Sequence, residues 1–506
     1  MSEDGLKTLY VYRMGIDTYK NPVIFLREDC EICKAEGFAA PSRVRVEIGN
    51  RFILATLQVV KPEIMPYGRV GFSEYAWEIL SAKDGDIVRL SHPAPLESLS
   101  YLRGKIHGKK LTETQMQEII SDIANNLYSN IHIASFITAC ANGNLSREET
   151  LHLTRAMINT GKILTWEQHQ IVDKHCIGGL PGNRTTMLVV PIVAAAGLTI
   201  PKTSSRAITS PAGTADTMEV LAPVKLNLAE MRKVVERENG CIVWGGAADL
   251  SPADDILIQV ERALNLDNES QAIASVLSKK VSAGSTHVLI DIPVGPTAKV
   301  RSHEDAEHLK ELFEDIAKRV GLIVKVLISN GSAPVGRGIG PALEARDVVA
   351  VLKNEEDAPQ DLRERALDLA GAILEFSPKI SKGDGRHRAQ KILESGKAWK
   401  KFQAICKAQG GMRRIPHAKY KHLITASKSG MIIEIDNRTL ASIAKLAGAP
   451  RSKAAGIELH ATLNDVVAAG DALFTIHAES KGALEYAVRG VCFEHDIMKI
   501  KGNNGC

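Results

Sequence analysis

The chain has 506 residues, of which 44% are hydrophobic and 24% are charged, and its formal net charge at pH 7 is +4. This length exceeds what one hydrophobic core organises, and the composition is ordinary for a soluble globular protein, so we expect several domains. Because the excess of positive charge is small and forms no basic block, the sequence argues against a nucleic-acid polymer as a partner, although basic residues could still bind small anions.

The sequence carries no signal for a membrane or for secretion. No stretch approaches the roughly 18 consecutive apolar residues of a membrane span, and MSEDGLKTLYVYRMG lacks the apolar run of a signal peptide. We therefore expect no membrane partner, and the eight scattered cysteines predict a cytoplasmic protein. Cys30 and Cys33 could be half of a zinc site or a redox pair, but no second pair follows at zinc spacing, so a locally structural or incidental role is favoured and no metal site is predicted.

Residues 1–92 are predicted to form an N-terminal β-barrel-like domain. Its short segments are β-branched and alternate in polarity, as half-buried strands do: TLYVYRM, NPVIFL, RVRVEIGN and FILATLQVV. The turn and prolines of SAKDGDIVRLSHPAP place its boundary near residue 92. We expect this domain to serve packing or assembly.

Residues 93–165 are predicted to form a helical bundle domain, because apolar residues recur there every three or four positions. Thr112 and Ser146 are each followed within three residues by Glu or Gln, which is typical of a helix N-cap. Gly143 and Gly161 are expected to end two of the helices.

Residues 166–415 alternate between strand and helix patterns, which predicts βαβ units, a mainly parallel sheet and a phosphate- or nucleotide-binding α/β domain. A long helical pattern at 251–281, interrupted near Leu266-Asp267-Asn268, is expected to contribute to the helical domain. Residues 416–506 predict a C-terminal α+β domain with the strand and Gly-Asp turn rhythm of a biotinyl-carrier-like hammerhead. Because it lacks the Met-Lys-Met that would carry biotin, we expect a structural role. The predicted fold class is thus multidomain α/β.

The first candidate site is DKHCIGGLPGNRTT, residues 173–186, where a strand enters, a glycine-rich loop turns and a helix begins near Thr185. Glycines let a backbone approach a ligand closely, and the free amides at a helix start favour an anion. The loop contains Lys174, Gly178, Gly179, Gly182, Arg184, Thr185 and Thr186. No GxxxxGK[ST] pattern is present, so this is not a Walker loop, and a simple strand-to-helix turn stays an alternative.

The second candidate is SSRAITSPAGT, residues 204–214, which also lies between a strand and a helix and is rich in hydroxyls. In open α/β sheets ligands bind at the carboxyl ends of the strands, so two such loops predict a two-pronged anion cradle. The alternative is that the Ser and Thr residues only cap a helix.

A third candidate is Asp267, which lies in the helix break before Ser275, Ser278, Lys279 and Lys280. An acid there could protonate a leaving group if burial raised its pKa, or it could simply cap a helix. The stretch GRGIGPALEARDV, residues 336–348, looks superficially like a dinucleotide loop, but its spacing favours a glycine-rich turn that opens a helix.

These motifs resemble the thymidine phosphorylase family over about residues 95–506, and most of all its AMP phosphorylase branch and the relatives that share an extra N-terminal β domain. The family signature reads Ser-x-Arg, then Gly-Gly-Thr-x-Asp-x-x-Glu. Here Ser204-Ser205-Arg206 leads to Ala212-Gly213-Thr214-Ala215-Asp216, with Glu219 following. The Lys-His-Ser-x-Gly-Gly phosphate loop of the family is present as Lys174-His175-Cys176-Ile177-Gly178-Gly179.

The departures from the nucleoside-specific branch bear on the substrate. That branch has Ser where Cys176 stands, His where Ser210 stands, and a shorter loop than Leu180-Pro181-Gly182-Asn183. Its arginine for the pyrimidine ring falls on Val260, with Arg262 two residues away. These differences favour the AMP branch.

The resemblance implies the roles of individual residues. The implied proton donor is Asp267. The implied nucleotide-binding residues are Gly179, Ser205, Arg206, Ala207, Ile208, Thr209, Ser210, Thr214, Ser275 and Lys299. The implied phosphate-binding residues are Lys174, Thr186, Ser204 and Thr214.

The resemblance also implies the reaction, which is reversible phosphorolysis of an N-glycosidic bond by a pentosyltransferase without a metal or organic cofactor. AMP and phosphate giving adenine and ribose 1,5-bisphosphate is the leading expectation. Thymidine phosphorolysis, giving thymine and 2-deoxyribose 1-phosphate, is the alternative enzyme, and a non-catalytic nucleotide-binding module is the alternative of another class. The expected partners are these small molecules and further copies of the chain in a homodimer or larger homo-oligomer.

Overall fold

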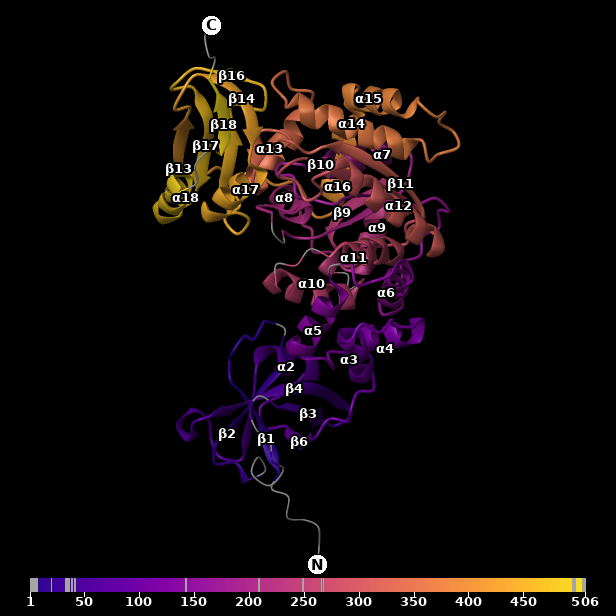
Figure 1. Ribbon diagram of the computed structural model, residues 1–506, viewed down its shortest axis with the longest axis vertical. Helices are drawn as coiled ribbons and strands as arrows, with labels where there is room; N and C mark the ends of the chain where they lie inside the picture. The colour runs from indigo at the N-terminus through magenta and orange to yellow at the C-terminus, as the bar shows by residue number, and fades with distance from the viewer. Residues whose placement is uncertain are drawn as a thin grey trace, which may run out of the picture. The chain divides into compact units, whose positions relative to one another are not determined.

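The computed structural model describes residues 8–19, 21–31, 37, 40, 42–141, 143–207, 210–247, 250–264, 266, 268–493 and 497–502. Figure 1 labels most of the helices and strands along the chain. The chain forms two compact units, Met1–Leu145 with Ile256–Asn268, and Ser146–Asp255 with Glu269–Cys506. The four predicted domain boundaries are finer than this division and stay predictions.

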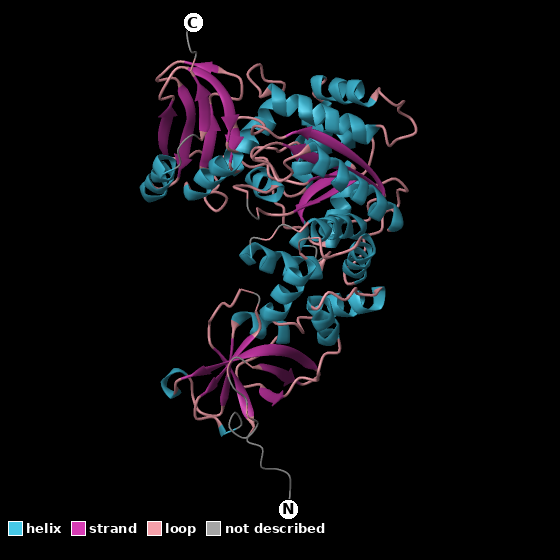
Figure 2. Ribbon diagram, viewed as in Figure 1, coloured by secondary structure: helices cyan, strands magenta, loops and turns pink. Residues whose placement is uncertain are grey.

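A closed six-stranded barrel forms the N-terminal part of the first unit, as the sequence predicts; its strands are among those drawn in magenta in Figure 2. The strand order is β1-β5-β2-β4-β3-β6. The strands are β1 (Leu9–Arg13), β2 (Val23–Arg27), β3 (Arg43–Ile48), β4 (Arg51–Val60), β5 (Arg69–Phe72) and β6 (Ile87–Ser91), with the short helices η1 (Pro62–Ile64) and α2 (Glu74–Leu80) between them. In β3, Val44, Val46 and Ile48 alternate inward into the barrel core. Cys30 is buried, and Cys33 lies outside the described residues.

Helices complete the first unit. They are α3 (Ser98–Ile106), α4 (Glu113–Ala124), α5 (Asn130–Cys140) and most of α10 (Pro252–Leu264). Thr112 caps α4 through a reciprocal pair with Gln115, which confirms the predicted N-cap. Ser146 likewise caps α6 (Arg147–Asn159) with Glu149, although α6 belongs to the second unit.

Parallel strands form the centre of the second unit, as predicted. The order β11-β10-β7 makes one sheet, β8-β9 make a pair, and a parallel bridge between Ile171 and Thr199 lies just before β7 and β8. The strands are β7 (Val172–Cys176), β8 (Ile200–Ser204), β9 (Gly240–Trp244), β10 (His287–Val294) and β11 (Ile323–Asn330). Leu289 enters one apolar core while Val288 and Ile290 enter another, so both faces of the sheet are covered.

The helices of these two cores come from different parts of the chain. One core contains residues of α7 (Thr186–Ala195), α14 (Gln360–Leu374), α15 (Gly385–Glu394) and α16 (Lys397–Ala408). The other contains residues of α11 (Glu269–Ser282) and α12 (His303–Arg319). The remaining elements of this part are α8 (Thr214–Leu221), α9 (Leu228–Glu238), η2 (Gly245–Ala247) and α13 (Pro341–Leu352).

The C-terminal part is α+β, as predicted, with two antiparallel sheets in the orders β12-β15-β17-β13 and β16-β14-β18. Its elements are β13 (Tyr420–Thr425), β14 (Gly430–Ile435), α17 (Asn437–Leu446), β15 (Gly456–Leu459), β16 (Val466–Val467), β17 (Ala472–Ala478), α18 (Lys481–Phe493) and β18 (Met498–Lys501), and β12 (Gly338–Ile339) joins from the α/β part. The hammerhead detail stays a prediction. Gly340 is the N-cap of α13 and Pro341 its first residue, so the stretch 336–348 is the predicted turn that opens a helix.

Candidate functional site

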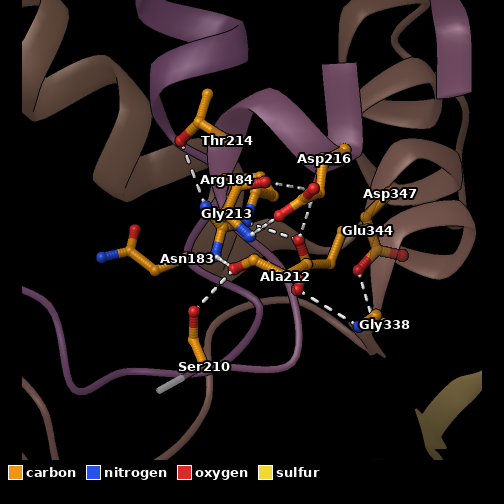
Figure 3. Close-up of polar contacts among 12 residues, drawn as sticks. Asn183, Arg184, Ser210, Ala212, Gly213, Thr214, Asp216, Gly338, Glu344 and Asp347 are labelled. Carbon is orange, nitrogen blue, oxygen red and sulfur yellow. Dashed lines mark hydrogen bonds and ion pairs between the residues drawn. The ribbon is translucent and has the colours of Figure 1, made fainter. Parts of the chain in front are cut away.

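The two candidate loops leave the carboxyl ends of neighbouring parallel strands, β7 and β8, and meet. Arg184 of the first loop donates to Thr214 Oγ1 at 3.1 Å and to the Ala212 carbonyl oxygen at 3.0 Å in the second (Figure 3). Its Nε lies 2.5 Å from Glu344 Oε2 of α13. The Ser210 hydroxyl also donates to the Ala212 carbonyl, at 2.9 Å. The loops therefore form one cradle, as their sequence pattern predicts.

Lys174 lies under this cradle with 1% of its surface exposed. Its ammonium donates to Thr185 Oγ1 at 2.8 Å, and its other two N–H groups have no hydrogen-bond acceptor among the described residues. Burial lowers the pKa of Lys174, while Cys176 and Asp291 raise it. A buried cation with unfilled donors is a place for an anion.

The hydroxyls predicted to bind phosphate lie in the same loops. The Ser204 hydroxyl oxygen, at the end of β8, is buried and lacks a hydrogen-bond partner among the described residues. Thr186 begins α7 and is buried, and Thr214 begins α8 and is half-buried. An unpartnered buried hydroxyl needs a reason, and a bound ligand would supply one here.

The surroundings of Gly179 explain why the first loop needs a glycine at this position. Its φ is 79°, and a Cβ on it would lie 2.6 Å from the backbone nitrogen of Lys299. The structure thus brings together two residues that the sequence predicts to bind substrate, one after β7 and one after β10.

Arg206 is paired with two carboxylates of α8. Its guanidinium donates to Asp216 at 3.0 Å and to both oxygens of Glu219, and it lies 5.0 Å from the ring centre of Trp244. The hydrogen bond from Arg206 holds the pKa of Glu219 at about 2. Lys453 adds an ion pair to Glu219 at 3.0 Å. Two carboxylates already balance this guanidinium, so contact of Arg206 with substrate stays a prediction.

Asp216 fixes the shape of the second loop. Its carboxylate accepts hydrogen bonds from the backbone nitrogens of Ala207 at 2.7 Å and Gly213 at 3.0 Å. A Cβ on Gly213 would lie 2.6 Å from the Ala207 nitrogen, so only glycine fits there. Arg206 and Asp216 together hold the loop in the form that presents Ser205 to solvent.

The remaining predicted residues are placed as follows. Ser275 lies half-buried on α11. Asp267, Ile208 and Thr209 lie outside the described residues, so their predicted roles rest on the sequence. Within the described part of the chain, no three His, Cys, Asp or Glu side chains are grouped to hold a metal ion, and no helix is long and apolar enough to cross a membrane.

Sequence reasoning missed several residues behind the cradle. Asp291 of β10 is fully buried and accepts from Ser329 at 2.5 Å, and Arg365 lies 3.3 Å from it. Glu344, which pairs with Arg184, was missed as well. One signal was available for Asp291, namely a single acid inside the apolar strand pattern HVLIDIPVG.

Comparisons with known proteins agree with this architecture. Residues 168–399 match the glycosyl transferase family a/b domain, residues 99–161 match the helical bundle domain of that family, and residues 431–495 match the pyrimidine nucleoside phosphorylase C-terminal domain. The anthranilate phosphoribosyltransferase of Thermus thermophilus shares the fold, with a TM-score of 0.51 and 19% identity over 61% of this chain and 98% of its own.

Full-length relatives are closer in sequence. A Legionella pneumophila (strain Paris) protein named "Putative thymidine phosphorylase" is 57% identical over 98% of this chain and 96% of its own. A Polaromonas protein (strain JS666) of the same name is 55% identical over 97% and 96%. The chain is therefore a pentosyltransferase that belongs to the pyrimidine-nucleoside phosphorylase family.

Proposed function

We propose that this protein catalyses the reversible phosphorolysis of a pyrimidine nucleoside, with thymidine as the first substrate, giving thymine and 2-deoxyribose 1-phosphate. The names of the relatives and the C-terminal domain family support this substrate class. The observation that carries the reaction type is the buried Lys174 ammonium, whose two unfilled N–H groups lie beneath a cradle of loop amides and hydroxyls.

The charge of the cradle suits a phosphate that must act as a nucleophile. Arg184 is paired with Glu344, and Arg206 is paired with Asp216 and Glu219. Lys174 therefore supplies the local positive charge, while Ser204, Thr186 and Thr214 supply neutral donors. Phosphate bound in this way keeps enough negative charge to attack the anomeric carbon of the sugar and to stabilise the oxocarbenium-like transition state.

The departing base gains an electron pair as the glycosidic bond breaks and needs a proton. We propose Asp267 as the donor, because the family resemblance implies that role for this residue, which stands between α10 and α11 in the sequence. Ser275 and Lys299 are the proposed contacts to the nucleoside. No metal or organic cofactor takes part in this scheme.

AMP is the second candidate substrate, and the sequence departures at Cys176, Ser210 and Val260 favour it. The structure shows Cys176 accepting a 3.4 Å hydrogen bond from Asn183 and Ser210 donating within its own loop. A nucleoside monophosphate would bring a second phosphate group, for which Lys299 and the hydroxyls of residues 205–210 are the proposed partners.

The finer parts of the account follow from the family and from the sequence. We propose a cytoplasmic homo-oligomer with domains at 1–92, 93–165, 166–415 and 416–506.

Release of free base from thymidine or AMP, with and without phosphate, tests the reaction. An Asp267→Asn variant that turns over at the wild-type rate would remove Asp267 from the mechanism. A protein that binds these compounds without turnover would be a nucleotide-binding module instead.

A further inference from the structure

A chain of hydrogen bonds links Lys174 to Cys176, which is the neighbour of Asp291 on the adjacent strand. Lys174 Nζ donates to Thr185 Oγ1 at 2.8 Å, and Thr185 Oγ1 donates to Asn183 Oδ1 at 3.1 Å. Asn183 Nδ2 then donates to Cys176 Sγ at 3.4 Å. Cys176 pairs in register with Asp291 on the neighbouring parallel strand β10, so the two side chains lie side by side on one face of the sheet.

Asp291 itself is held rigidly from the far side. Ser329 of β11 donates to its Oδ1 at 2.5 Å, and Arg365 of α14 lies 3.3 and 3.4 Å from its two oxygens. Arg365 in turn donates to the Asn330 carbonyl at 2.7 Å. The carboxylate is therefore fixed by two elements that contribute no predicted substrate contact.

The charged and titratable groups around Lys174 show how Asp291 affects the pKa of the Lys174 ammonium. They are Cys176 on its own strand, Asp291 on β10, Arg365 on α14 and Arg184 in the loop before α7. Burial and the two arginines lower the pKa of Lys174, while Cys176 and Asp291 raise it. Burial and Asp291 raise the pKa of the Cys176 thiol to about 11, so this thiol is neutral at pH 7. Asp291 is thus the carboxylate that favours the charged form of Lys174.

We propose that Asp291 is a positioning residue for phosphate, which orients the Lys174 ammonium through its strand neighbour Cys176 and the hydrogen bonds of Asn183 and Thr185. Asp291 does not touch phosphate; it acts on the residue that does. This role of Asp291 rests on the proposed phosphorolysis, and Asp291 lies outside the two loop motifs.

The test compares Asp291→Asn with the wild type and with Asp368→Asn, which removes an exposed carboxylate from the same helix that carries Arg365. Steady-state kinetics at varied inorganic phosphate and varied thymidine give both KM values, and log kcat/KM for phosphate is measured against pH. Equilibrium binding of inorganic phosphate to each protein is measured by calorimetry, so that the result stands apart from turnover.

Asp291→Asn is expected to raise the KM and Kd for phosphate about tenfold or more, because a buried charged partner is lost. The KM for thymidine should stay within about twofold, as expected when only phosphate binding is weakened. The alkaline limb of the phosphate profile should move to lower pH, because Lys174 loses its proton more readily without Asp291. Asp368→Asn should match the wild type in all of these.

Other outcomes are equally decisive. A folded Asp291→Asn protein with wild-type phosphate affinity and an unmoved alkaline limb overturns the proposal, and so does an equal rise of both KM values. If Asp291→Asn does not fold, two other variants decide. Cys176→Ala must weaken phosphate binding and Cys176→Ser must keep the wild-type affinity for phosphate, or the proposal fails. If the wild type binds phosphate but releases no base, the proposed function fails while the Kd comparison still decides the role of Asp291.

Discussion

Gly179 and Lys299 approach each other so closely that a methyl group on Gly179 would lie 2.6 Å from the Lys299 backbone nitrogen. Gly178, one residue earlier, also has a positive φ, of 95°, but a methyl group there would meet nothing within 4 Å. The two glycines therefore separate the cost of backbone strain from the cost of the contact.

We expect Gly179→Ala to lower kcat/KM by at least about a hundredfold, because a displacement of about 1 Å at a reacting centre has that effect. Gly178→Ala should lose much less of its kcat/KM. Because both glycines have a positive φ, the two variants should lower the thermal midpoint by similar amounts. Steady-state kinetics and thermal unfolding of both variants check this. Equal kinetic losses in the two would show that the Lys299 contact is unimportant.

Ser204→Ala should affect folding and binding in opposite directions. Its buried hydroxyl oxygen has no partner among the described residues, so its removal should leave the thermal midpoint unchanged or raise it. If that hydroxyl donates to phosphate, the KM for phosphate should rise about tenfold. Unfolding and kinetics on one preparation measure both effects. An unchanged KM would take Ser204 out of the phosphate site.

Removing only one charge of the Arg184–Glu344 pair should cost more stability than replacing both residues by apolar ones. Glu344 has a fully buried side chain, and burial raises its pKa despite the nearby guanidinium. Glu344→Gln leaves Arg184 buried without its counter-charge and should destabilise the fold by about 3–5 kcal/mol. Arg184→Met combined with Glu344→Leu should recover much of this stability, yet should lose activity because Arg184 joins the two loops. Denaturant unfolding and kcat/KM of the single and double variants check both points.

Glu219 should make stability depend on pH in acid. Its folded pKa is about 2, below the ordinary value of 4.5, because Arg206 and Lys453 bind its charged form. A depressed carboxyl pKa contributes stability above the unfolded pKa, and this contribution is lost as the pH falls from about 4.5 towards 2. Thermal midpoints across this range should fall more steeply in the wild type than in Glu219→Gln. Parallel curves would mean that the ion pair contributes nothing measurable.

Local patterns in the sequence were enough to predict the cradle. Around residues 173–186 and 204–214, a strand, a glycine- or hydroxyl-rich turn and a helix start follow one another within a few positions. Each of these three features is determined by residues that are close together along the chain. The barrel was predictable for the same reason, since alternation within β3 already separates its inner and outer faces.

Long-range partners were not predictable. Ser329 and Arg365 lie 38 and 74 residues from Asp291, and no short pattern links them. The sequence also gave no indication that Asp216 and Glu219 of α8 both accept hydrogen bonds from the Arg206 guanidinium. The position of α6 in the second unit depends on packing against α11, which the helical periodicity of α6 does not encode.

Phosphate-dependent base release is the most direct measurement of the central claim. The purified protein is incubated with thymidine, uridine, adenosine, AMP, CMP or UMP, each with and without inorganic phosphate, and the free base is quantified. The account predicts release from thymidine or uridine only when phosphate is present. Release from the monophosphates alone would instead establish the nucleotide substrate that Cys176, Ser210 and Val260 favour. Release that is independent of phosphate, or absent from every compound, would contradict phosphorolysis itself.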